Sequence, residues 1–487
     1  MRSTTLSELC ANDATFPEGS GTLQIAGLAL DSRQVQPGFL FAALSGAARH
    51  GREFVGQALE KGAVALLADD GLDLEQAEAV VTVRAPDARR AFSLMAARFF
   101  KEQPECVVAI TGTSGKTSTA AFVRQIFQRL GHSSAAIGTL GVTRGDGSQA
   151  GSLTTPDTVS LHKMLASLAG DGITHLAIEA SSHGLEQRRL DGMKLEAAAF
   201  TNLGRDHLDY HPTMEDYFQA KSRLFDPVLP PGKSAVVWLD SGYSTRIVDL
   251  ARARNQRVLT VGMARGDISI DLVRPSGSHQ IVGFTFNSQQ HTIQLPLPGL
   301  FQVANAMMAA ALAIQVGLEP NAVFSSLETL KGARGRLENI GTGTNGGTVF
   351  IDYCHKPDAV EEALKALRPF ADGKVVIVIG AGGDRDTGKR TLMGEAAARY
   401  ADIVIVTDDN PRSEDPATIR AAVRKGAPGS MEIGDRREAI RAGLNRIEQG
   451  DLLLVAGKGH ETGQEIKGVK HPFSDHDVVL ELLEQGH

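Results

Sequence analysis

The segment Gly112-Thr113-Ser114-Gly115-Lys116-Thr117 has the residue types of a phosphate-binding loop. It follows an apolar run, Cys106 to Thr111, that is typical of a buried strand, and it precedes a helical pattern over Thr117 to Leu130. At such a junction, backbone N–H groups and the positive end of the helix dipole surround one anion. Lys116 can reach the outer phosphates of a nucleotide and the Thr117 hydroxyl can bind Mg²⁺. The sequence therefore predicts an ATP site.

This loop is shorter than the loop of kinases and GTPases. Their pattern places a glycine five positions before the second glycine, and that position is Ile110, which belongs to the predicted strand. The alternative interpretation, a Gly-rich turn with an incidental lysine, fits the strand and helix around it poorly.

Two candidate metal ligands follow other predicted strands. Glu179 ends the apolar run Leu176 to Ile178, and His207 follows the run Ala197 to Phe200. In open α/β sheets the ligand crevice lies at the carboxyl ends of the strands, so both side chains are expected to face the phosphate loop. A carboxylate and an imidazole there can hold Mg²⁺. Taken one at a time, each is more often an ordinary surface residue.

Composition restricts the function classes. The 487 residues predict about three domains, and 42% apolar and 22% charged residues are typical of a globular protein. A formal net charge of -7 argues against non-specific binding of nucleic acid but allows a small anionic ligand. Cys10, Cys106 and Cys354 form no metal-ligand spacing, which fits a reducing compartment.

Neither a signal peptide nor a membrane segment is predicted. The first 20 residues lack a continuous apolar stretch, and the longest apolar run, Met307 to Val316, is too short to cross a bilayer. We therefore expect a cytoplasmic protein without membrane insertion.

β-branched runs alternate with Ala-rich helical segments along the chain, which predicts α/β domains. Fully apolar runs at Val375–Ile379, Ile403–Val406 and Leu452–Val455 indicate strands buried on both faces of a parallel sheet. Polar breaks near 101–105 and 331–335 give expected domains of 1–102, 103–334 and 335–487.

Nine motifs occur in an order and at spacings that resemble the Mur ligase family, which builds the peptide stem of bacterial cell-wall precursors. They are GTSGKTS, EASSHGLEQRR, TNLGRDHLDYH, AKSRLF, GRLE, DYCHKPDA, GGDRDTGKR, DNPRSEDP and AGKGHE. The resemblance covers nearly the whole chain and is greatest to the ligases that add the third residue of the stem. It implies an N-terminal domain for the UDP-sugar, a central P-loop ATPase-type domain with a parallel or mixed sheet, and a Rossmann-like C-terminal domain for the amino acid.

The resemblance also implies a reaction and a metal site. ATP phosphorylates the γ-carboxylate of D-glutamate in UDP-MurNAc-L-Ala-D-Glu, and an amino group attacks the acyl phosphate to give an amide. The implied Mg²⁺ ligands are Thr117, Glu179, His207 and Lys221, the last as a carbamate formed with CO₂; Lys116 acts on the phosphates. Residue reasoning alone predicts instead that Lys221 is a solvated helix residue.

Substrate contacts are likewise implied by the resemblance. For ATP they are the loop residues 112–117 with Ser118, Asn305 near adenine, Arg336 on a phosphate and Asp352 on the ribose. For the UDP-sugar they are Leu30, Ser32, Ala47, Ala48, Arg49, Thr154, Thr155, Ser181, Gln187 and Arg189. Three positions depart from the family pattern: Cys354 and Lys356 stand where Ala and Thr are more frequent, and Leu153 stands where Asn often precedes the paired threonines.

The segment Asp409-Asn410-Pro411-Arg412 resembles the motif of members that add meso-diaminopimelate, whereas lysine-adding members lack the arginine. Diaminopimelate carries one more carboxylate than lysine, and an arginine fork suits a buried carboxylate. Arg385, Gly457 and Glu461 match further contacts of this subsite. A carboxylate site left without its partner costs enough for about a thousandfold discrimination. Taken alone, Arg412 could instead be a surface residue in a proline turn.

Three other functions agree less well with the sequence. A dinucleotide-dependent oxidoreductase is suggested by Gly380 to Gly383 after the run Val375–Ile379, but its fingerprint needs glycine at 385, where Arg stands. A non-catalytic nucleotide-binding regulator would bind nucleotide without releasing phosphate. Folylpolyglutamate synthetase, a related ligase, is disfavoured by the N-terminal segment and the DNPR motif. We expect a monomeric ligase that uses ATP as co-substrate and Mg²⁺ as cofactor, with no nucleic-acid partner.

Overall fold

The computed structural model describes residues 3–46, 49–74, 80–145, 147–149, 153–207 and 210–486, and Ala47 and Ala48 of the predicted sugar-nucleotide site lie outside them. The chain forms two compact units. The first comprises Met1–Val261 with Met308–Glu319, and the second comprises Gly262–Met307 with Pro320–His487. Each unit is described by itself below.

The first unit begins with a parallel sheet in the order β3-β4-β5-β6. Because alternate side chains of a strand point to opposite faces, the sheet is covered on both sides. Leu40 and Leu67 pack with the helices α1 and α3, whereas Phe41 and Leu66 pack with α2. The bounds are β1 (Thr4–Thr5), α1 (Leu6–Cys10), β2 (Gln24–Ile25), β3 (Gly27–Ala29), β4 (Phe39–Ala42), α2 (Val55–Glu60), β5 (Ala65–Asp69), β6 (Val81–Ala85) and α3 (Ala88–Phe100).

The strands of a second sheet that belong to this unit, as far as β14, have the order β10-β9-β8-β11-β7-β12-β13-β14. The strands β8, β11, β7, β12, β13 and β14 are parallel to one another. β9 pairs antiparallel with β8, and β10 pairs antiparallel with β9. Leu165 of α5 and Ile247 of α8 belong to one core cluster with the strands, and α4 packs on β8 and β11. The strands are β7 (Cys106–Thr111), β8 (Ser134–Gly138), β9 (Gly141–Arg144), β10 (Gly147–Gln149), β11 (His175–Glu179), β12 (Ala197–Phe200), β13 (Ser234–Trp238) and β14 (Arg257–Met263). The helices are α4 (Lys116–Arg129), α5 (Thr158–Gly170), α6 (Ser182–Glu186), α7 (Met214–Ser222) and α8 (Ser244–Ala253).

The parallel order places the carboxyl ends of β7, β8, β11 and β12 along one edge. The phosphate loop follows β7, Thr139 follows β8, Glu179 ends β11 and Thr201 follows β12. This edge therefore brings together segments that are up to about 90 residues apart in the chain, as the hydrogen bond from Thr113 N to Asn202 O shows.

The second unit contains an antiparallel meander and a doubly covered sheet. The meander is β15 (Ile268–Ser276), β16 (His279–Phe286) and β17 (Gln289–Leu295), and α10 (Pro320–Leu327) packs on β17. The helix α9 spans Leu300–Gln315, and only its residues 300–307 belong to this unit.

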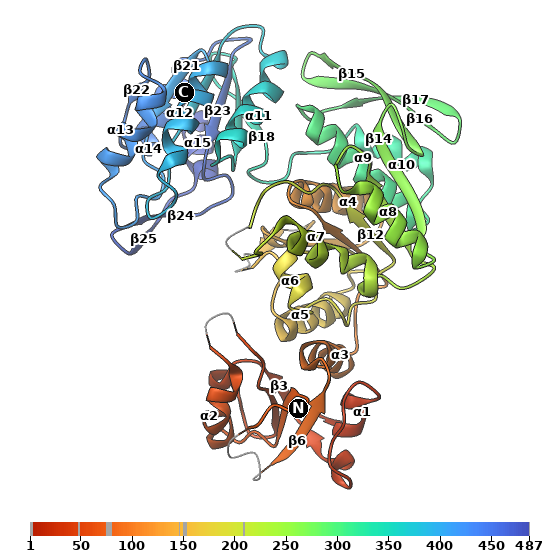
Figure 1. The fold of residues 1–487 in the computed structure, drawn as a ribbon. Helices are drawn as coiled ribbons and strands as arrows, with labels where there is room; N and C mark the ends of the chain where they lie inside the picture. Colours follow the sequence, from red (N-terminus) through yellow and green to blue (C-terminus); the bar gives the residue numbers. More distant parts are fainter. Residues whose placement is uncertain are drawn as a thin grey trace. The chain divides into compact units, whose positions relative to one another are not determined.

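The doubly covered sheet has the order β18-β19-β23-β20-β21-β22, parallel except for β18. Ile377 faces a cluster with α11, α12 and α13, and its neighbour Val378 faces a cluster with α14 and α15 (Figure 1). The bounds are β18 (Glu338–Thr342), β19 (Thr348–Asp352), α11 (Pro357–Leu367), β20 (Val375–Ile379), α12 (Gly388–Tyr400), β21 (Ile403–Val406), α13 (Pro416–Gly426), β22 (Met431–Glu432), α14 (Arg436–Leu444), β23 (Leu452–Ala456), β24 (Gly463–Ile466), β25 (Val469–Pro472) and α15 (Asp475–Glu484).

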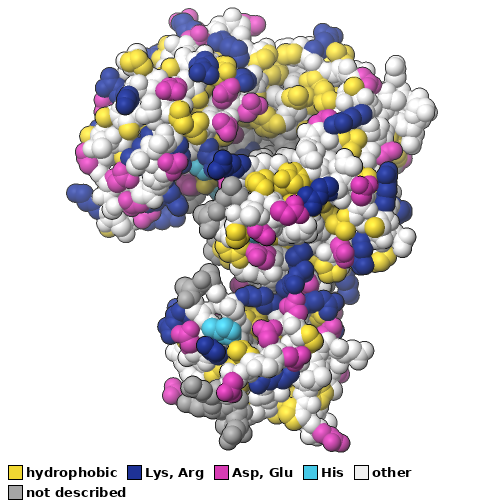
Figure 2. Space-filling view, viewed as in Figure 1, with side chains coloured by type: hydrophobic (Ala, Val, Ile, Leu, Met, Phe, Trp, Pro, Cys, Tyr) yellow, Lys and Arg dark blue, Asp and Glu magenta, His cyan; other side chains and the backbone are white. Residues whose placement is uncertain are grey.

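The predicted fold class, α/β with parallel and mixed sheets, is confirmed. None of the helices formed by the described residues combines the length and the apolar character that crossing a bilayer requires. On the face drawn in Figure 2, basic and acidic side chains are interspersed, the pattern of an ordinary solvated surface.

Candidate active site

The phosphate loop is held in shape by two glycines and by the segment after β12. Gly112 has φ 150°, and a Cβ there would collide with Thr201 Oγ1; Gly115, which caps α4, has φ 87°. Ser114 N donates to Asn202 Oδ1 at 3.0 Å. Lys116 Nζ donates to the carbonyls of Gly112 at 2.7 Å and Thr113 at 2.9 Å. The lysine predicted to bind phosphates thus lies folded over the loop itself.

Glu179 lies beside the loop, as predicted, and its carboxylate is buried, with 2% of the residue exposed. One oxygen accepts a hydrogen bond from Thr139 N at 2.8 Å, and the other accepts from Thr117 Oγ1 at 3.0 Å and Thr139 Oγ1 at 3.2 Å. The two oxygen donors predicted for Mg²⁺, Thr117 and Glu179, therefore converge. Sequence reasoning missed Thr139, although the strand-end rule applied to β8 identifies it.

Lys221 also reaches the loop. Only 1% of the residue is exposed, its Nζ donates to Gly112 O at 2.9 Å and lies 4.5 Å from the centre of the Tyr217 ring. Burial, and then the nearby Lys116, lower the pKa of Lys221 well below its ordinary value. The prediction of a solvated residue is wrong, because the last turn of α7 packs beneath the loop. Tyr217, whose hydroxyl lies 3.2 Å from Thr113 Oγ1, was missed by sequence reasoning.

His207 has a positive φ of 53° and a half-exposed side chain. Burial lowers its pKa, Asp206 opposes that shift, and His183, Lys116 and Lys221 lower it further. The centre of its ring lies 6.0 Å from that of Tyr217, which contacts the loop at Thr113. A lowered pKa favours the neutral form that binds metals. Among the described residues, no three His, Cys, Asp or Glu side chains approach closely enough to form a metal site by themselves.

The predicted sugar-nucleotide residues of the central sheet form one hydrogen-bonded group. Thr155 Oγ1 donates to Glu179 O at 2.8 Å and accepts from Ser181 N at 3.0 Å. Arg189 donates to Thr155 O at 2.6 Å and to Gln187 Oε1 at 2.7 Å. Thr154 Oγ1 lies 3.1 Å from Thr139 Oγ1, which links this group to the Glu179 carboxylate.

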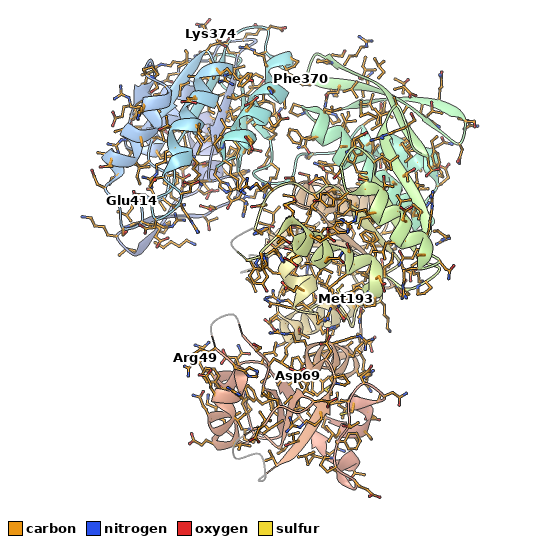
Figure 3. All side chains as sticks on the ribbon, viewed as in Figure 1. Arg49, Asp69, Met193, Phe370, Lys374 and Glu414 are labelled. Carbon is orange, nitrogen blue, oxygen red and sulfur yellow. The ribbon has the colours of Figure 1, made fainter. Side chains whose placement is uncertain are left out.

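The remaining described sugar-nucleotide residues lie by the N-terminal sheet. Ser32 is buried and donates to Gln57 Oε1 at 2.6 Å, and Leu30 is half-buried at the end of β3. Arg49 pairs with Glu53 at 2.8 Å and lies over the Phe54 ring near α2 (Figure 3).

The residues predicted for adenine, phosphate and ribose lie in the second unit. Asp352 ends β19, where its carboxylate accepts from Leu337 N and Cys354 N, each at 2.7 Å. Burial raises its pKa, and Arg336 opposes that shift. Gln302 Nε2 donates to Arg336 O at 3.1 Å, and Asn305 Nδ2 donates to Gln302 Oε1 at 3.4 Å. Asn305, Arg336 and Asp352 thus form one neighbourhood.

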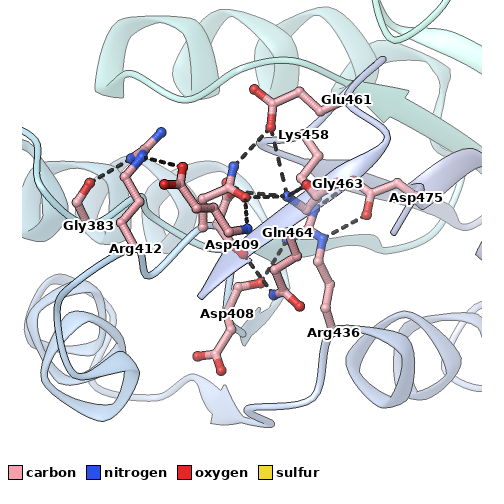
Figure 4. Close-up of polar contacts among 12 residues, drawn as sticks. Gly383, Asp408, Asp409, Arg412, Arg436, Lys458, Glu461, Gly463, Gln464 and Asp475 are labelled. Carbon is pink, nitrogen blue, oxygen red and sulfur yellow. Dashed lines mark hydrogen bonds and ion pairs between the residues drawn. The ribbon is translucent and has the colours of Figure 1, made fainter. Parts of the chain in front are cut away.

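The residues predicted for the amino acid gather around the ends of β21 and β23 (Figure 4). Asn410 Nδ2 donates to Glu461 Oε2 at 2.9 Å, and a Cβ on Gly457 would lie 2.7 Å from Asp409 Oδ2. Pro411 approaches Gly383 so closely that a Cβ on that glycine would collide with its carbonyl.

The two arginines of this group border Gly382, near which lie Nη1 of Arg412 and the side chain of Arg385. Arg412 donates to Gly383 O at 2.6 Å, and its Nε lies 3.4 Å from Glu465. Arg385 is exposed. Sequence reasoning missed Glu465 and also Lys458, which contacts Asn410. For Lys458 the available signal was its place just after the buried strand β23.

Three family models match the chain in order. They are the Mur ligase family catalytic domain over residues 24–100, the Mur ligase middle domain over 110–313 and the Mur ligase glutamate ligase domain over 335–459.

Curated relatives match nearly end to end. The UDP-N-acetylmuramoyl-L-alanyl-D-glutamate--2,6-diaminopimelate ligase of Bradyrhizobium diazoefficiens is 50% identical over 98% of this chain and 99% of its own length. The ligase of the same name from Rhizobium meliloti is 50% identical over 96% of this chain and 98% of its own.

Solved structures agree. A structure of a ligase with that name superimposes with a TM-score of 0.75 at 33% identity, covering 100% of both chains. The MurF ligase of Thermotoga maritima in complex with ADP has a TM-score of 0.59 at 19% identity over 94% of this chain and 97% of its own, and shows the fold alone. With near-complete coverage at half identity and all three domain models in sequence, the chain belongs to the Mur ligase family.

Proposed function

We propose that this chain is an ATP-dependent ligase that adds meso-2,6-diaminopimelate to the γ-carboxylate of D-glutamate in UDP-MurNAc-L-Ala-D-Glu, a step in the synthesis of peptidoglycan precursors. The observation that carries the proposal is 50% identity, over 98% of the chain, to a ligase named for this substrate and this amino acid. The phosphate loop beside a buried carboxylate, and an arginine pair beside Asp409 and Asn410, supply the chemistry that such a reaction needs.

The reaction has two steps. A carboxylate oxygen of the substrate attacks the γ-phosphorus of ATP, which releases ADP and forms an acyl phosphate. The neutral amine of diaminopimelate then attacks the acyl carbon, phosphate leaves and a proton is lost, which gives the amide. The first step brings two anions together, so its transition state depends on nearby positive charge. The backbone N–H groups of residues 112–117 and the Lys116 ammonium provide it, with Lys116 exchanging the loop carbonyls for phosphate oxygens.

Mg²⁺ is the proposed cofactor, and the ligands proposed for it fit a cation if Lys221 is not a free ammonium. The Thr117 hydroxyl and the Glu179 carboxylate converge at 3.0 Å, and His207 is favoured in its neutral form. An unmodified Lys221 ammonium would repel the cation, so we propose that Lys221 carries a carbamate, which is an anionic oxygen ligand. When bound, Mg²⁺ would neutralise phosphate charge.

The same proposal assigns substrate contacts to three sets of residues. Asn305, Arg336 and Asp352 would hold the adenine, a phosphate and the ribose of ATP, with Ser118 following the loop. Thr154, Thr155, Ser181, Gln187 and Arg189 would bind the sugar nucleotide, together with Leu30, Ser32 and residues 47–49 of the N-terminal part. Arg385, Arg412, Gly457, Glu461 and residues 409–411 would bind diaminopimelate.

We also propose a cytoplasmic location and a monomeric state. The free thiols of Cys10, Cys106 and Cys354 are compatible with a reducing compartment, and ATP and UDP-activated sugars are available there. Size-exclusion chromatography with light scattering tests the monomer.

The decisive experiment measures phosphate release from ATP and Mg²⁺ in the presence of UDP-MurNAc-L-Ala-D-Glu, with meso-diaminopimelate or L-lysine as the amine. We expect turnover with diaminopimelate and about a thousandfold lower kcat/KM with lysine. Equal rates with both amines would refute the specificity, and no turnover with either amine would refute the function. A reaction without the sugar nucleotide measures background hydrolysis of ATP.

A further inference from the structure

Lys458 is a fully buried lysine that lies two residues after β23. Its Nζ donates to Gly463 O at 2.8 Å and to Asn410 Oδ1 at 3.1 Å, and it lies 3.5 Å from Asp409 Oδ1 and 3.8 Å from Glu461 Oε2 (Figure 4). Burial lowers its pKa, and the carboxylates of Asp409 and Glu461 oppose that shift. A buried ammonium surrounded by oxygen acceptors is satisfied in place.

The acceptors come from two separate loops. Asp409 and Asn410 follow β21, whereas Glu461 and Gly463 follow β23. Lys458 therefore links the segment after β21 to the segment after β23, which together carry the proposed diaminopimelate contacts other than Arg385. Gln464 adds a second tie, because its Nε2 donates to Asp409 O at 2.7 Å.

The contacts also fix which way the Asn410 amide points. Its oxygen accepts from Lys458 and, at 3.0 Å, from Glu465 N, and neither of these nitrogens can accept a hydrogen bond. The amide NH₂ must therefore face Glu461, to which it donates at 2.9 Å. In this way Lys458 determines the orientation of the Asn410 amide and, through it, that of the Glu461 carboxylate.

A second buried cation near Lys458, Arg436, is neutralised by its own carboxylate partner. Arg436 and Asp475, both without exposed side-chain surface, form a pair at 2.7 Å, and Arg436 also donates to Ala456 O at 2.9 Å (Figure 4). The charge of Lys458 is therefore directed to Asp409 and Glu461, two carboxylates for one ammonium. One negative charge remains uncompensated in this trio, which suits the distal ammonium of a diamino acid.

We propose that Lys458 is a positioning residue for amino-acid recognition, which holds Asp409, Asn410 and Glu461 in the arrangement that receives the distal end of diaminopimelate. The proposal rests on the proposed function. It concerns the KM of one substrate only, because the side chains that Lys458 contacts, those of Asp409, Asn410 and Glu461, all belong to that group.

The test compares wild type with Lys458→Met, which keeps an unbranched side chain one atom shorter and removes the charge and the donors of the lysine. Buried acceptors that lose their donor cost enough to raise the KM for diaminopimelate by roughly tenfold or more. The KM values for ATP and for the sugar nucleotide should stay within about twofold of wild type. Lys458→Gln, which keeps one donor group, should give an intermediate KM for diaminopimelate.

Ile440→Ala serves as the matched control. Ile440 is a fully buried residue of α14 that packs in the core beside β20 and β23. Its truncation lowers stability without changing the segments that hold residues 409–410 and 461. The control should lower the melting temperature and leave the KM for diaminopimelate unchanged. A merely structural role of Lys458 predicts that Lys458→Met behaves in the same way.

Three results would overturn the proposal: an unchanged KM for diaminopimelate, a parallel rise in all three KM values, or failure of both Lys458 variants to fold. Absence of turnover in the wild type would instead refute the proposed function, so the two failures are distinguishable.

Discussion

At the scale of single residues, Lys221 combines burial with a second cation nearby. Its amine has almost no contact with solvent, and burial together with Lys116 pulls its pKa well below the ordinary range. CO₂ reacts with a neutral amine and not with an ammonium, and the reaction gives a carbamate and one released proton. The site therefore favours the reactive form of this lysine.

From this we predict that Lys221→Ala lowers kcat by about a hundredfold or more, because a ligand for the charge-neutralising cation is lost. Short carboxylic acids such as formate should partly restore activity, since they supply an anionic oxygen in the vacated space. Lys221→Arg is the matched variant: it keeps a positive charge, cannot form the carbamate and leaves no space, so the acids should not rescue it. Full activity of Lys221→Ala without added acid would rule out the carbamate.

Arg412 is held in place by two contacts of its guanidinium. Its guanidinium contacts Gly383 O and Glu465 at the same time, so it is held in one orientation beside Gly382. Lysine has no planar fork and cannot keep these contacts while pairing with a carboxylate. We expect Arg412→Lys to raise the KM for diaminopimelate at least about tenfold, with a much smaller effect on kcat.

Initial rates at varied diaminopimelate measure this effect, and Arg424→Lys is the control. Arg424 lies on α13 and pairs with Glu432 at 2.6 Å. This ion pair does not include any of residues 409–412. If the KM of Arg412→Lys equals that of wild type, Arg412 does not belong to the subsite.

The sequence predicts these residues unevenly. Glu179 and Thr117 could be paired because Glu179 ends one strand of a parallel sheet and the loop that leads to Thr117 follows another, and their side-chain oxygens do lie 3.0 Å apart. The burial of Lys221 and Lys458 could not be predicted from residue type, because each is buried by a segment distant in the chain: Gly112 for the first and Asn410 for the second. Roles taken from family resemblance, including every substrate contact, stay predictions.

At the scale of elements, α4 has a left-handed glycine at each end. Gly115 precedes it with φ 87°, and Gly131 follows it with φ 88° and nothing within 4 Å of a Cβ. An alanine at either position adopts an unfavourable backbone conformation, which costs about 1 kcal/mol.

Gly115→Ala and Gly131→Ala should therefore lower the stability of the protein by similar amounts. Only Gly115 lies in the phosphate loop, so only the Gly115→Ala variant should bind ATP more weakly. Its kcat/KM for ATP should fall by roughly a hundredfold. Thermal unfolding and ATP titrations separate the two effects. A comparable loss of ATP affinity in Gly131→Ala would mean that the helix as a whole, and not the loop, carries the effect.

Elements were predicted best where the apolar pattern was continuous. The runs Cys106–Thr111, Ala197–Phe200, Val375–Ile379 and Ile403–Val406 coincide with β7, β12, β20 and β21. The helix predicted over Thr117 to Leu130 begins and ends one residue earlier, because Gly115 already takes the capping position. The antiparallel meander β15–β17 was not singled out, since its strands alternate buried and exposed residues around polar turns. The domain boundaries at 102 and 334 remain predictions.

At the scale of the whole molecule, buried histidines make stability depend on pH. Burial lowers the pKa of His162, on α5 where that helix packs against α3, from 6.5 to about 4, and lowers that of His460 to about 4 as well. Asp191 acts in the opposite direction, because burial raises its pKa to about 6. Its contribution is therefore fully present at low pH and lost as the pH rises through 6.

His162 takes up a proton at a higher pH in the unfolded chain than in the folded chain. Between pH 6.5 and 4 the unfolded chain binds a proton on this residue that the folded chain does not, so its contribution to stability is full above pH 6.5 and falls as the pH is lowered. At pH 5 the loss from His162 amounts to about 2 kcal/mol. We predict that His162→Leu, which removes the titrating group from a buried position, loses markedly less stability than wild type between pH 7.5 and pH 5. Thermal unfolding at the two pH values measures the difference, and His471→Gln, at an exposed position, is the control. A wild type and a His162→Leu variant whose melting temperatures fall in parallel would show that His162 is protonated as readily in the folded chain as in the unfolded one.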